Sequence, residues 1–217
     1  MSASSTRVGD RHFEYIRAHT LAEGRLLGDL KHAAREAGIP PIWIAPEEAA
    51  FLQVLLRATG ARRVVEIGTL AGYSAIAMAR ALPEDGTLLT IEIEDRYADF
   101  AERWIARSDV AGRVEVRRGD ARDVLPTLES GWADACFLDA DKAGYESYLR
   151  ECRRIVRPGG LFLVDNAFAF GQLFDERPTD REAPAVQAFN EHIAAQEWID
   201  AVIVPLGDGV WVGVSRG

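Results

Sequence analysis

The chain has 217 residues, 48% of them hydrophobic and 27% charged, which is typical of one soluble globular domain. Its formal net charge of −9 argues against a nucleic-acid-binding surface, because such a surface needs clustered positive charge. No apolar run approaches the roughly 20 residues that span a bilayer, and residues 1–10 lack the apolar centre of a signal peptide. Cys136 and Cys152 have neither metal-binding nor redox spacing, so we expect a reducing, cytoplasmic setting and no membrane partner.

The beginning of the sequence is expected to be helical. Residues 10–17 form a short predicted helix. Residues 20–37 form a longer one, because Thr20 and Glu23 have the spacing of an N-terminal capping box and Gly38 is suited to end a helix.

A proline pair interrupts this helical part. Residues 40–41 are both proline and predict an extended linker, and Pro46 is suited to the first position of a helix that ends at Gly60. We therefore expect residues 1–45 to form an N-terminal helical extension or lid, and residues 46–217 to form the core of a single domain.

From Arg63 onward the sequence alternates between strand and helix patterns. The predicted strands are 63–67, 87–93, 113–117, 134–139, 160–165, 200–204 and 210–215. The predicted helices are 73–82, 95–108, 121–129, 144–156 and 182–196. Helical segments after each of the first five strands indicate a parallel sheet covered on both faces, whereas Pro205-Leu-Gly-Asp-Gly209 is typical of a hairpin. The sequence thus predicts an α/β, Rossmann-like fold with a seven-stranded, mostly parallel sheet and an antiparallel C-terminal hairpin strand.

The turn after the first predicted strand reads Glu66-Ile-Gly68-Thr-Leu-Ala-Gly72. A strand that passes through a glycine loop into a helix offers free backbone N–H groups to a nucleotide-like ligand. The turn has neither the G-x-G-x-x-G of dinucleotide sites nor the G-K-[ST] of phosphate loops. The Glu66 carboxylate would repel a pyrophosphate and accept hydrogen bonds from an ammonium group. S-adenosylmethionine carries such an ammonium group and no phosphate.

Two further acidic residues follow the next strands. At the end of the second strand Glu92, with Glu94 as the alternative, can accept hydrogen bonds from both ribose hydroxyls. After the third strand Asp120 can accept the adenine amino group, and the Ala121 N–H can contact the ring. Taken singly, each acidic residue can equally cap a helix or lie solvated at the sheet edge.

Five motifs in order resemble the cation-dependent O-methyltransferases, the family of catechol and plant caffeoyl-coenzyme A O-methyltransferases. They read V-V-E-I-G-T-L-A-G-Y-S-A, T-I-E-I-E, G-D-A, F-L-D-A-D-K and V-D-N. The resemblance extends from about Pro46 to the C-terminus and implies a class I methyltransferase fold, S-adenosylmethionine as cofactor and a homodimer. It implies contacts with the cofactor at Glu66, Gly68, Tyr73, Ser74, Glu92, Asp120, Ala121 and Asp139. Ser74, at the start of a helix, is expected to meet the methionine carboxylate.

Oxygen-bearing side chains also follow the fourth and fifth strands. Asp139 ends the fourth strand, and Asp165 and Asn166 end the fifth. If these strands are neighbours, the three side chains can bind a hard cation, with Mg²⁺ the natural occupant and Ca²⁺ or Mn²⁺ as competitors. Alternatively, the two carboxylates cap the following segments. The resemblance assigns the metal to the same three positions.

Lys142 is one of only two lysines in the chain and follows Asp139 by three residues. A lysine can act as a base, whereas an arginine cannot. Two vicinal hydroxyls of a catechol can chelate the cation, which lowers their pKa, and Lys142 can then take the proton. We expect the phenolate to attack the sulfonium methyl in line, with Lys142 and Asp139 as the catalytic residues. Asp141 is expected to orient Lys142 or a metal-bound water.

The acceptor pocket is predicted around four residues. Phe168 and Phe170, directly after the metal ligands, can stack on an aromatic ring or simply pack in the core. Trp43, in the linker, is a candidate for the lid, and Asp141 is the fourth member. Because no lysine-rich cluster suggests coenzyme A binding, we expect a free small-molecule phenol as the acceptor.

Four other interpretations compete with a metal-dependent catechol O-methyltransferase. A nicotinamide-dependent oxidoreductase would need G-x-G-x-x-G and no Glu66. A methyltransferase acting on nucleic acid or protein would need a basic face. A cofactor-binding protein without activity, or a methyltransferase-fold protein with a non-catechol acceptor, remains open, although Asp139, Lys142, Asp165 and Asn166 together favour catalysis.

Overall fold

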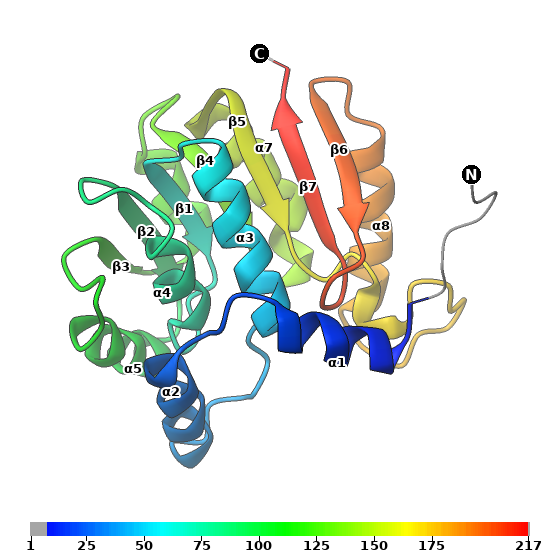
Figure 1. Ribbon diagram of the computed structural model, residues 1–217. Helices are drawn as coiled ribbons and strands as arrows, with labels where there is room; N and C mark the ends of the chain where they lie inside the picture. Colours follow the sequence, from blue (N-terminus) through cyan, green and yellow to red (C-terminus); the bar gives the residue numbers. More distant parts are fainter. Residues whose placement is uncertain (1–7, 217) are drawn as a thin grey trace.

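The computed structural model describes residues 8–216, which form a central seven-stranded sheet with helices on both faces (Figure 1). The strand order is β3-β2-β1-β4-β5-β7-β6. The strands are β1 Arg63–Ile67, β2 Thr87–Glu92, β3 Val114–Arg118, β4 Ala133–Leu138, β5 Val156–Val164, β6 Ile199–Val204 and β7 Val210–Ser215. The first five strands run parallel, and β7 pairs antiparallel with both β5 and β6. The predicted mostly parallel sheet with an antiparallel C-terminal hairpin is confirmed.

Helices cover the sheet because successive residues of each strand point to opposite faces. In β1, Val64 belongs to one buried cluster and Val65 to the other. Side chains of α2 to α5 complete the first cluster, and those of α6 to α8 complete the second. The helices are α1 Asp10–His19, α2 Arg25–Glu36, α3 Pro46–Ala58, α4 Tyr73–Ala79, α5 Asp95–Ala106, α6 Ala121–Val124, α7 Tyr145–Ile155 and α8 Ala183–Ala194.

The predicted start of the second helix is wrong. α2 begins at Arg25, and its N-cap is Gly24, whose φ of 80° is a conformation that glycine adopts readily. The Glu23 carboxylate cannot close a capping box on Thr20, because it accepts hydrogen bonds from Lys31 Nζ at 2.6 Å and from the Tyr73 hydroxyl at 2.9 Å. A tertiary contact therefore overrides the local capping signal.

The N-terminal helices lie against the core. On α1, the Arg17 guanidinium donates through Nε and Nη2 to the Glu47 carboxylate on α3, at 3.1 and 3.2 Å. On α2, Leu27, Leu30 and Ala34 are buried in the first cluster. Residues 1–7, which make up most of the stretch without a signal-peptide pattern, lie outside the described residues. Within the described part of the chain, no helix combines the length and apolarity needed to cross a membrane.

The register of the sheet brings the functional strand ends together. Ile67 at the end of β1 pairs with Leu138 in β4, and Leu138 pairs with Val164 in β5. The residues that follow these partners are Gly68, Asp139 and Asp165, which therefore meet at one edge of the sheet. Ligands of α/β sheets bind outside this carboxyl edge, so the site follows from the topology.

Candidate active site

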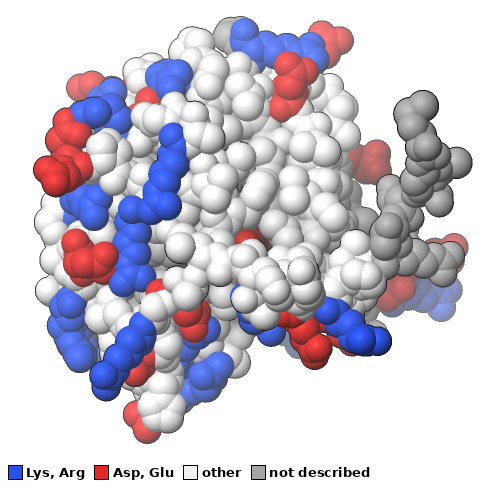
Figure 2. Space-filling model, viewed as in Figure 1, with Lys and Arg blue, Asp and Glu red and all other residues white. Residues whose placement is uncertain are grey.

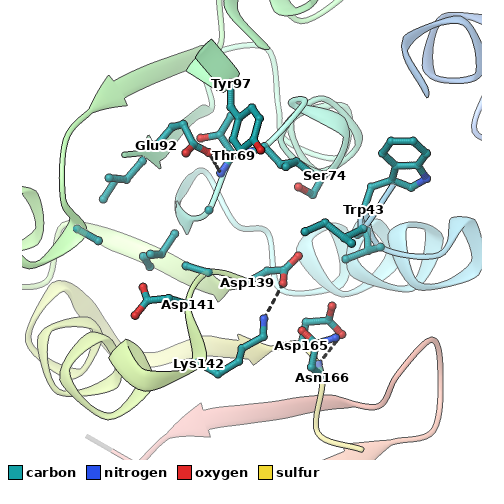
Figure 3. A pocket seen from close by; sticks show the side chains of 18 of the residues that line it. Trp43, Thr69, Ser74, Glu92, Tyr97, Asp139, Asp141, Lys142, Asp165 and Asn166 are labelled. Atoms are coloured by element: carbon teal, nitrogen blue, oxygen red, sulfur yellow. Dashed lines mark hydrogen bonds and ion pairs between the residues drawn. The ribbon is translucent and has the colours of Figure 1, made fainter. Parts of the chain in front are cut away.

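A cavity of about 800 Å³ lies at the carboxyl edge of the sheet (Figure 3). Most residues predicted for the site line it, namely Trp43, Gly68, Tyr73, Ser74, Glu92, Asp120, Ala121, Asp139, Asp141, Lys142, Asp165, Asn166 and Phe170. Two predicted residues, Glu66 and Phe168, are not among the described residues that line it. The sheet thus collects side chains from five strand ends around one space.

The loop between β1 and α4 depends on glycine and on Glu92. Gly68 has a φ of 100°, and a Cβ at this position would lie 2.1 Å from the carbonyl oxygen of Asp139. The Glu92 Oε2 accepts hydrogen bonds from the N–H groups of Thr69 and Leu70, at 3.2 and 2.8 Å. Its Oε1 accepts from the Glu94 N–H at 2.9 Å. Glu92 therefore shapes the loop as well as lining the cavity, and Glu94, the alternative, lines the cavity too.

Glu66 lies beneath the cavity, in the middle of the core. Its side chain is 0% exposed, and neither carboxylate oxygen has a hydrogen-bond partner among the described residues. Burial raises the pKa of Glu66 to about 8, against the opposing influence of the Ser74 and Thr90 hydroxyls. An acid of this kind is mostly neutral at pH 7 and would ionise next to a cationic ligand. Both Glu66 oxygens lack a described partner, but they are buried below the described cavity wall, so the predicted contact with the ammonium group of the cofactor stays a prediction.

The next two predicted contacts differ in what they touch. Ser74, at the start of α4, is buried and lines the cavity. Tyr73 lines the cavity, and its hydroxyl donates a hydrogen bond to Glu23 in the N-terminal segment. The Lys31 ammonium lies 5.3 Å from the centre of the Tyr73 ring. Tyr73 therefore joins the start of α4 to the N-terminal segment.

Asp120 acts as a helix cap in this structure. Its Oδ1 accepts the Arg122 N–H at 2.8 Å, which caps α6, and its carboxylate also pairs with the Arg122 guanidinium at 2.5 Å. The pairing lowers the pKa of Asp120. The capping alternative is thus realised, while Asp120, Ala121 and Arg122 all line the cavity.

The three predicted metal ligands stand side by side at the ends of β4 and β5 (Figure 3). Asp165 is 6% exposed, and burial followed by the charge of Asp139 raises its pKa to about 7. The Asn166 N–H donates to Asp165 Oδ1 at 2.6 Å. No three His, Cys, Asp or Glu side chains within residues 8–216 are grouped so that they could hold a metal, but the predicted set needs only two carboxylates and an amide. Two crowded carboxylates beside an amide oxygen suit a hard cation.

Glu48 is an acidic residue of the site that the sequence reasoning missed. It lies in the first turn of α3, is 1% exposed and lines the cavity. Its Oε1 has no hydrogen-bond partner among the described residues, and burial together with Asp165 and Asp139 raises its pKa well above the ordinary value. A signal was present, because Glu48 precedes the buried Leu52 by four residues and so shares its helix face.

Lys142 is held between two oxygens. It is 5% exposed, and its Nζ donates to Asp139 Oδ1 at 3.1 Å and to the Tyr145 hydroxyl at 2.7 Å. Tyr145 is fully buried, and burial first, then the negative charge of Asp139, raises the pKa of its hydroxyl well above 10. The hydroxyl therefore keeps its proton and donates it to the carbonyl oxygen of Leu138, at 3.3 Å. Tyr145 was also missed, although its i+3 spacing from Lys142 was visible.

Asp141 has a hydrogen-bond partner that the sequence did not predict. Its Oδ1 accepts from the Tyr148 hydroxyl at 2.5 Å, and the pKa of that hydroxyl is raised by burial and by this contact. Gly144 makes room for the ring, because a Cβ there would lie 2.4 Å from it. Asp141, Tyr148 and Lys142 all line the cavity, and the Tyr148 hydroxyl is the side-chain hydrogen-bond partner given for Asp141 in the described structure.

The aromatic residues predicted for the acceptor pocket divide into two groups. Trp43 lines the cavity and packs under the Arg35 guanidinium, 4.9 Å from the ring centre. Phe170 lines the cavity and is 37% exposed. Phe168 instead packs its ring on Gly209 in the β6–β7 turn, where an added Cβ would lie 2.9 Å from the ring. Phe168 is half-buried in this packing contact and is not among the described residues that line the cavity.

The cavity is strongly acidic. Of the described residues that line it, ten are Asp or Glu and two, Arg122 and Lys142, are basic. Two of the ten acids, Glu48 and Asp165, have raised pKa values and so carry less than a full negative charge near pH 7. Low-dielectric walls focus such a field into the cavity. The space therefore attracts cationic ligands and disfavours anionic ones.

The known proteins and structures that this chain resembles are O-methyltransferases. The sequence model of a family described as O-methyltransferase matches residues 17–215. A catechol O-methyltransferase of Niastella koreensis is 39% identical over 174 residues, 79% of this chain and 79% of that protein. One of Mycobacterium tuberculosis is 36% identical over 84% of this chain and 83% of that protein. The crystal structure of the O-methyltransferase TomG from Streptomyces achromogenes, in complex with S-adenosylmethionine, is 32% identical, with a TM-score of 0.86 over 96% of this chain and 97% of that one.

Proposed function

Because the chain belongs to the O-methyltransferase family, whose members here use S-adenosylmethionine, we propose that it methylates one hydroxyl of a small catechol-type acceptor with the help of a divalent cation. One observation carries the proposal. The pair Asp139 and Asp165, with Asn166, lies beside the buried Lys142 at the wall of a single cavity. Lys142 can act as the base, and the three oxygen-bearing side chains can hold a hard cation next to it. Such a pair is suited to deprotonate a diol that is chelated by the cation.

The methyl donor is proposed to occupy the part of the cavity above the β1–α4 loop. Backbone N–H groups at the start of α4 and the Ser74 hydroxyl are suited to its carboxylate. The Glu66 carboxyl, without a partner in the core, is suited to its ammonium group. Glu92 and Asp120 remain the candidates for its ribose and adenine, although Asp120 would have to share its carboxylate with Arg122.

The cation is proposed to be held by Asp139, Asp165 and Asn166. When bound, it would supply a positive charge that lowers the pKa of an acceptor hydroxyl. The protein contributes the rest. Lys142 Nζ takes the hydroxyl proton, while Asp139 Oδ1 and the Tyr145 hydroxyl hold that nitrogen in place.

The acceptor is proposed to be a catechol without an anionic group. Trp43 and Phe170 offer aromatic surface to its ring, and both line the cavity. The surplus of acidic side chains disfavours carboxylated diols and coenzyme A thioesters. Two relatives are named catechol O-methyltransferases, which supports this class. A non-catechol acceptor is the alternative.

Methylation of a catechol panel tests the proposal. The protein is incubated with S-adenosylmethionine and Mg²⁺, with and without EDTA, and products are identified by mass spectrometry. We expect one methyl group on neutral and cationic catechols, and loss of product with EDTA. Product that survives EDTA would contradict the cation role, and product only from monophenols or other acceptors would favour the alternative.

The chain is further proposed to be a cytoplasmic homodimer. Figure 2 shows a broad face over α3, β5 and β7 with few charged side chains. Val202 pairs with Val212, and Val214 lies two residues further along β7, so both share the sheet face on which Val212 packs against the first buried cluster and α3. Val202 and Val214 are 60% and 40% exposed, and Val54 of α3 is 59% exposed. An exposed apolar area between charged rims is typical of a protein interface.

A further inference from the structure

A strained backbone segment follows the proposed metal ligands. Asn166, Ala169 and Phe170 have φ values of 66°, 53° and 58°. Residues with a Cβ rarely adopt this conformation, so the surrounding structure must hold the segment in place. The segment, residues 166–171, begins with a proposed cation ligand and carries Phe170 to the cavity wall.

One residue of the β6–β7 hairpin holds both ends of this segment. Asp208 Oδ2 accepts the Phe170 N–H at 2.8 Å and the Asn166 Nδ2 at 3.3 Å. Its backbone carbonyl oxygen accepts the Phe168 N–H at 2.8 Å. Asp208 itself lines the cavity. We call these three contacts the Asp208 clamp.

The clamp also decides which way the Asn166 amide faces. A carboxylate accepts hydrogen bonds and has none to donate, so the amide must present Nδ2 to Asp208. The amide oxygen, Oδ1, is then the atom left for another partner. An oxygen is the atom that a hard cation requires, whereas an amide NH₂ cannot bind one.

We propose that Asp208 is a positioning residue, which orients the amide oxygen of Asn166 toward the cation and holds Phe170 against the acceptor. The role of Asp208 in orienting Asn166 rests on the proposed function, since it needs a cation at Asp139, Asp165 and Asn166. The clamp on Phe170 needs no ligand. Residues behind a ligand that fix its orientation commonly change metal affinity 10- to 100-fold when they are removed.

Hydrogen exchange on the metal-free protein tests the clamp by itself. In Asp208→Ala we expect peptides covering residues 165–174 to exchange at least about tenfold faster, because the Phe170 N–H loses its acceptor. Asp208→Asn should keep wild-type exchange, since one amide oxygen can accept both hydrogen bonds. Asp200→Ala is the matched control, because Asp200 lies in the same hairpin and pairs only with the exposed Arg216 among described contacts. Unchanged exchange in Asp208→Ala would overturn the clamp.

Titration with Mn²⁺, followed by electron paramagnetic resonance without acceptor, tests the cation half. We expect Asp208→Ala to weaken Mn²⁺ binding about 10- to 100-fold, with unchanged affinity for S-adenosylhomocysteine, and Asp208→Asn to stay within about threefold of wild type. In an Asn166→Ala background, Asp208→Ala should add no further loss, since the residue to be oriented is gone. Additive losses would show a merely structural role and overturn the proposal.

Two outcomes separate this proposal from the proposed function. A wild-type protein that binds no Mn²⁺ would remove the cation from the proposed function and would overturn the proposal that Asp208 orients Asn166. Hydrogen exchange would then decide whether Asp208 holds Phe170 in place. If Asp208→Ala loses cooperative unfolding, Asp208→Asn decides instead. A tenfold loss of Mn²⁺ affinity in that variant would assign the effect to charge and overturn the positioning role.

Discussion

At the scale of single residues, the site is a set of buried polar groups with too few partners. Glu48 and Glu66 have carboxylate oxygens without hydrogen bonds among the described residues, and Asp165 is crowded by Asp139. Buried unpaired groups of this kind cost stability, so they are retained where a ligand satisfies them. One prediction at this scale concerns Lys142, which these acids surround, and a second concerns Glu66 itself.

The first prediction concerns the support of Lys142. Tyr145→Phe removes the hydroxyl that lies 2.7 Å from Lys142 Nζ, while the Asp139 contact remains. We expect kcat for a catechol to fall about tenfold, with the KM for the acceptor unchanged and the free energy of unfolding lower by about 1 kcal/mol. Steady-state kinetics and urea titration check this, with Tyr15→Phe on the exposed face of α1 as control. A change in KM alone would contradict the positioning of Lys142.

The second prediction concerns the proton on Glu66. Its pKa of about 8 in the folded protein lies above the ordinary value of 4.5, so the folded state keeps a proton that the unfolded chain releases. Its contribution to stability is therefore lost as pH rises from about 4.5 to 8. Relative to Glu66→Gln, the cofactor-free wild type should lose roughly 3 kcal/mol of unfolding free energy between pH 5 and pH 8 in urea titrations. Parallel pH curves for the two proteins would contradict this assignment.

At the scale of elements, side-chain hydrogen bonds link the N-terminal segment to α4 and α3. Glu23 joins α2 to α4, since it accepts from Lys31 and from Tyr73. Arg17 joins α1 to Glu47, which directly precedes Glu48 of the cavity. If the N-terminal segment is the predicted lid, these contacts should make its ordering affect the proposed cofactor site.

The third prediction tests this coupling. Glu23→Ala should speed hydrogen exchange over residues 25–36 and weaken binding of S-adenosylhomocysteine about fivefold, because Tyr73 loses its acceptor. Glu36→Ala is the matched control on the same helix, since its contact with His32 is exposed. Calorimetry and exchange measured on the same samples check both effects. Faster exchange with unchanged cofactor affinity would mean that the segment is not a lid for this ligand.

The sequence predicted the sheet and the acids at its strand ends, because apolar runs and parallel topology determine both. The sequence-based prediction failed where a side chain forms its hydrogen bonds with a residue of another helix or strand. Glu23 was assigned to a capping box but pairs with Tyr73, and Asp208 was seen only as part of a turn. Glu48 was overlooked because acidic residues are common in the first turn of a helix. Pairing of distant side chains is a tertiary property that local patterns do not contain.

At the scale of the whole molecule, charge and apolar surface are segregated. The chain has a formal net charge of −9, and ten acidic residues line one cavity. The face that bears Val54, Val202 and Val214 is apolar. Acidic residues therefore gather at the ligand site, and apolar residues gather where a second copy is proposed to bind.

The fourth prediction tests that second copy. Val202→Glu places a charge at a side chain that is 60% exposed on β6, and we expect it to weaken self-association at least about tenfold. Light scattering after size-exclusion chromatography measures the mass across a dilution series. Thr87→Glu adds the same charge on β2, near the other side of the sheet, and should leave the mass unchanged. A dimeric Val202→Glu variant would place the interface elsewhere. A monomeric wild-type protein would contradict the proposed dimer.

The position of β7 has a consequence for synthesis. β7, residues 210–215, is synthesised after the other six strands of the described sheet, yet it lies between β5 and β6. Until it is made, β5 presents an open edge, and the turn that carries Asp208 cannot close over Asn166. The part of the cavity proposed for the methyl donor can therefore assemble before β7 is made, whereas the part proposed for the acceptor needs β7 and its turn. Nascent chains stalled before residue 205 should expose an aggregation-prone strand edge and lack the acceptor site.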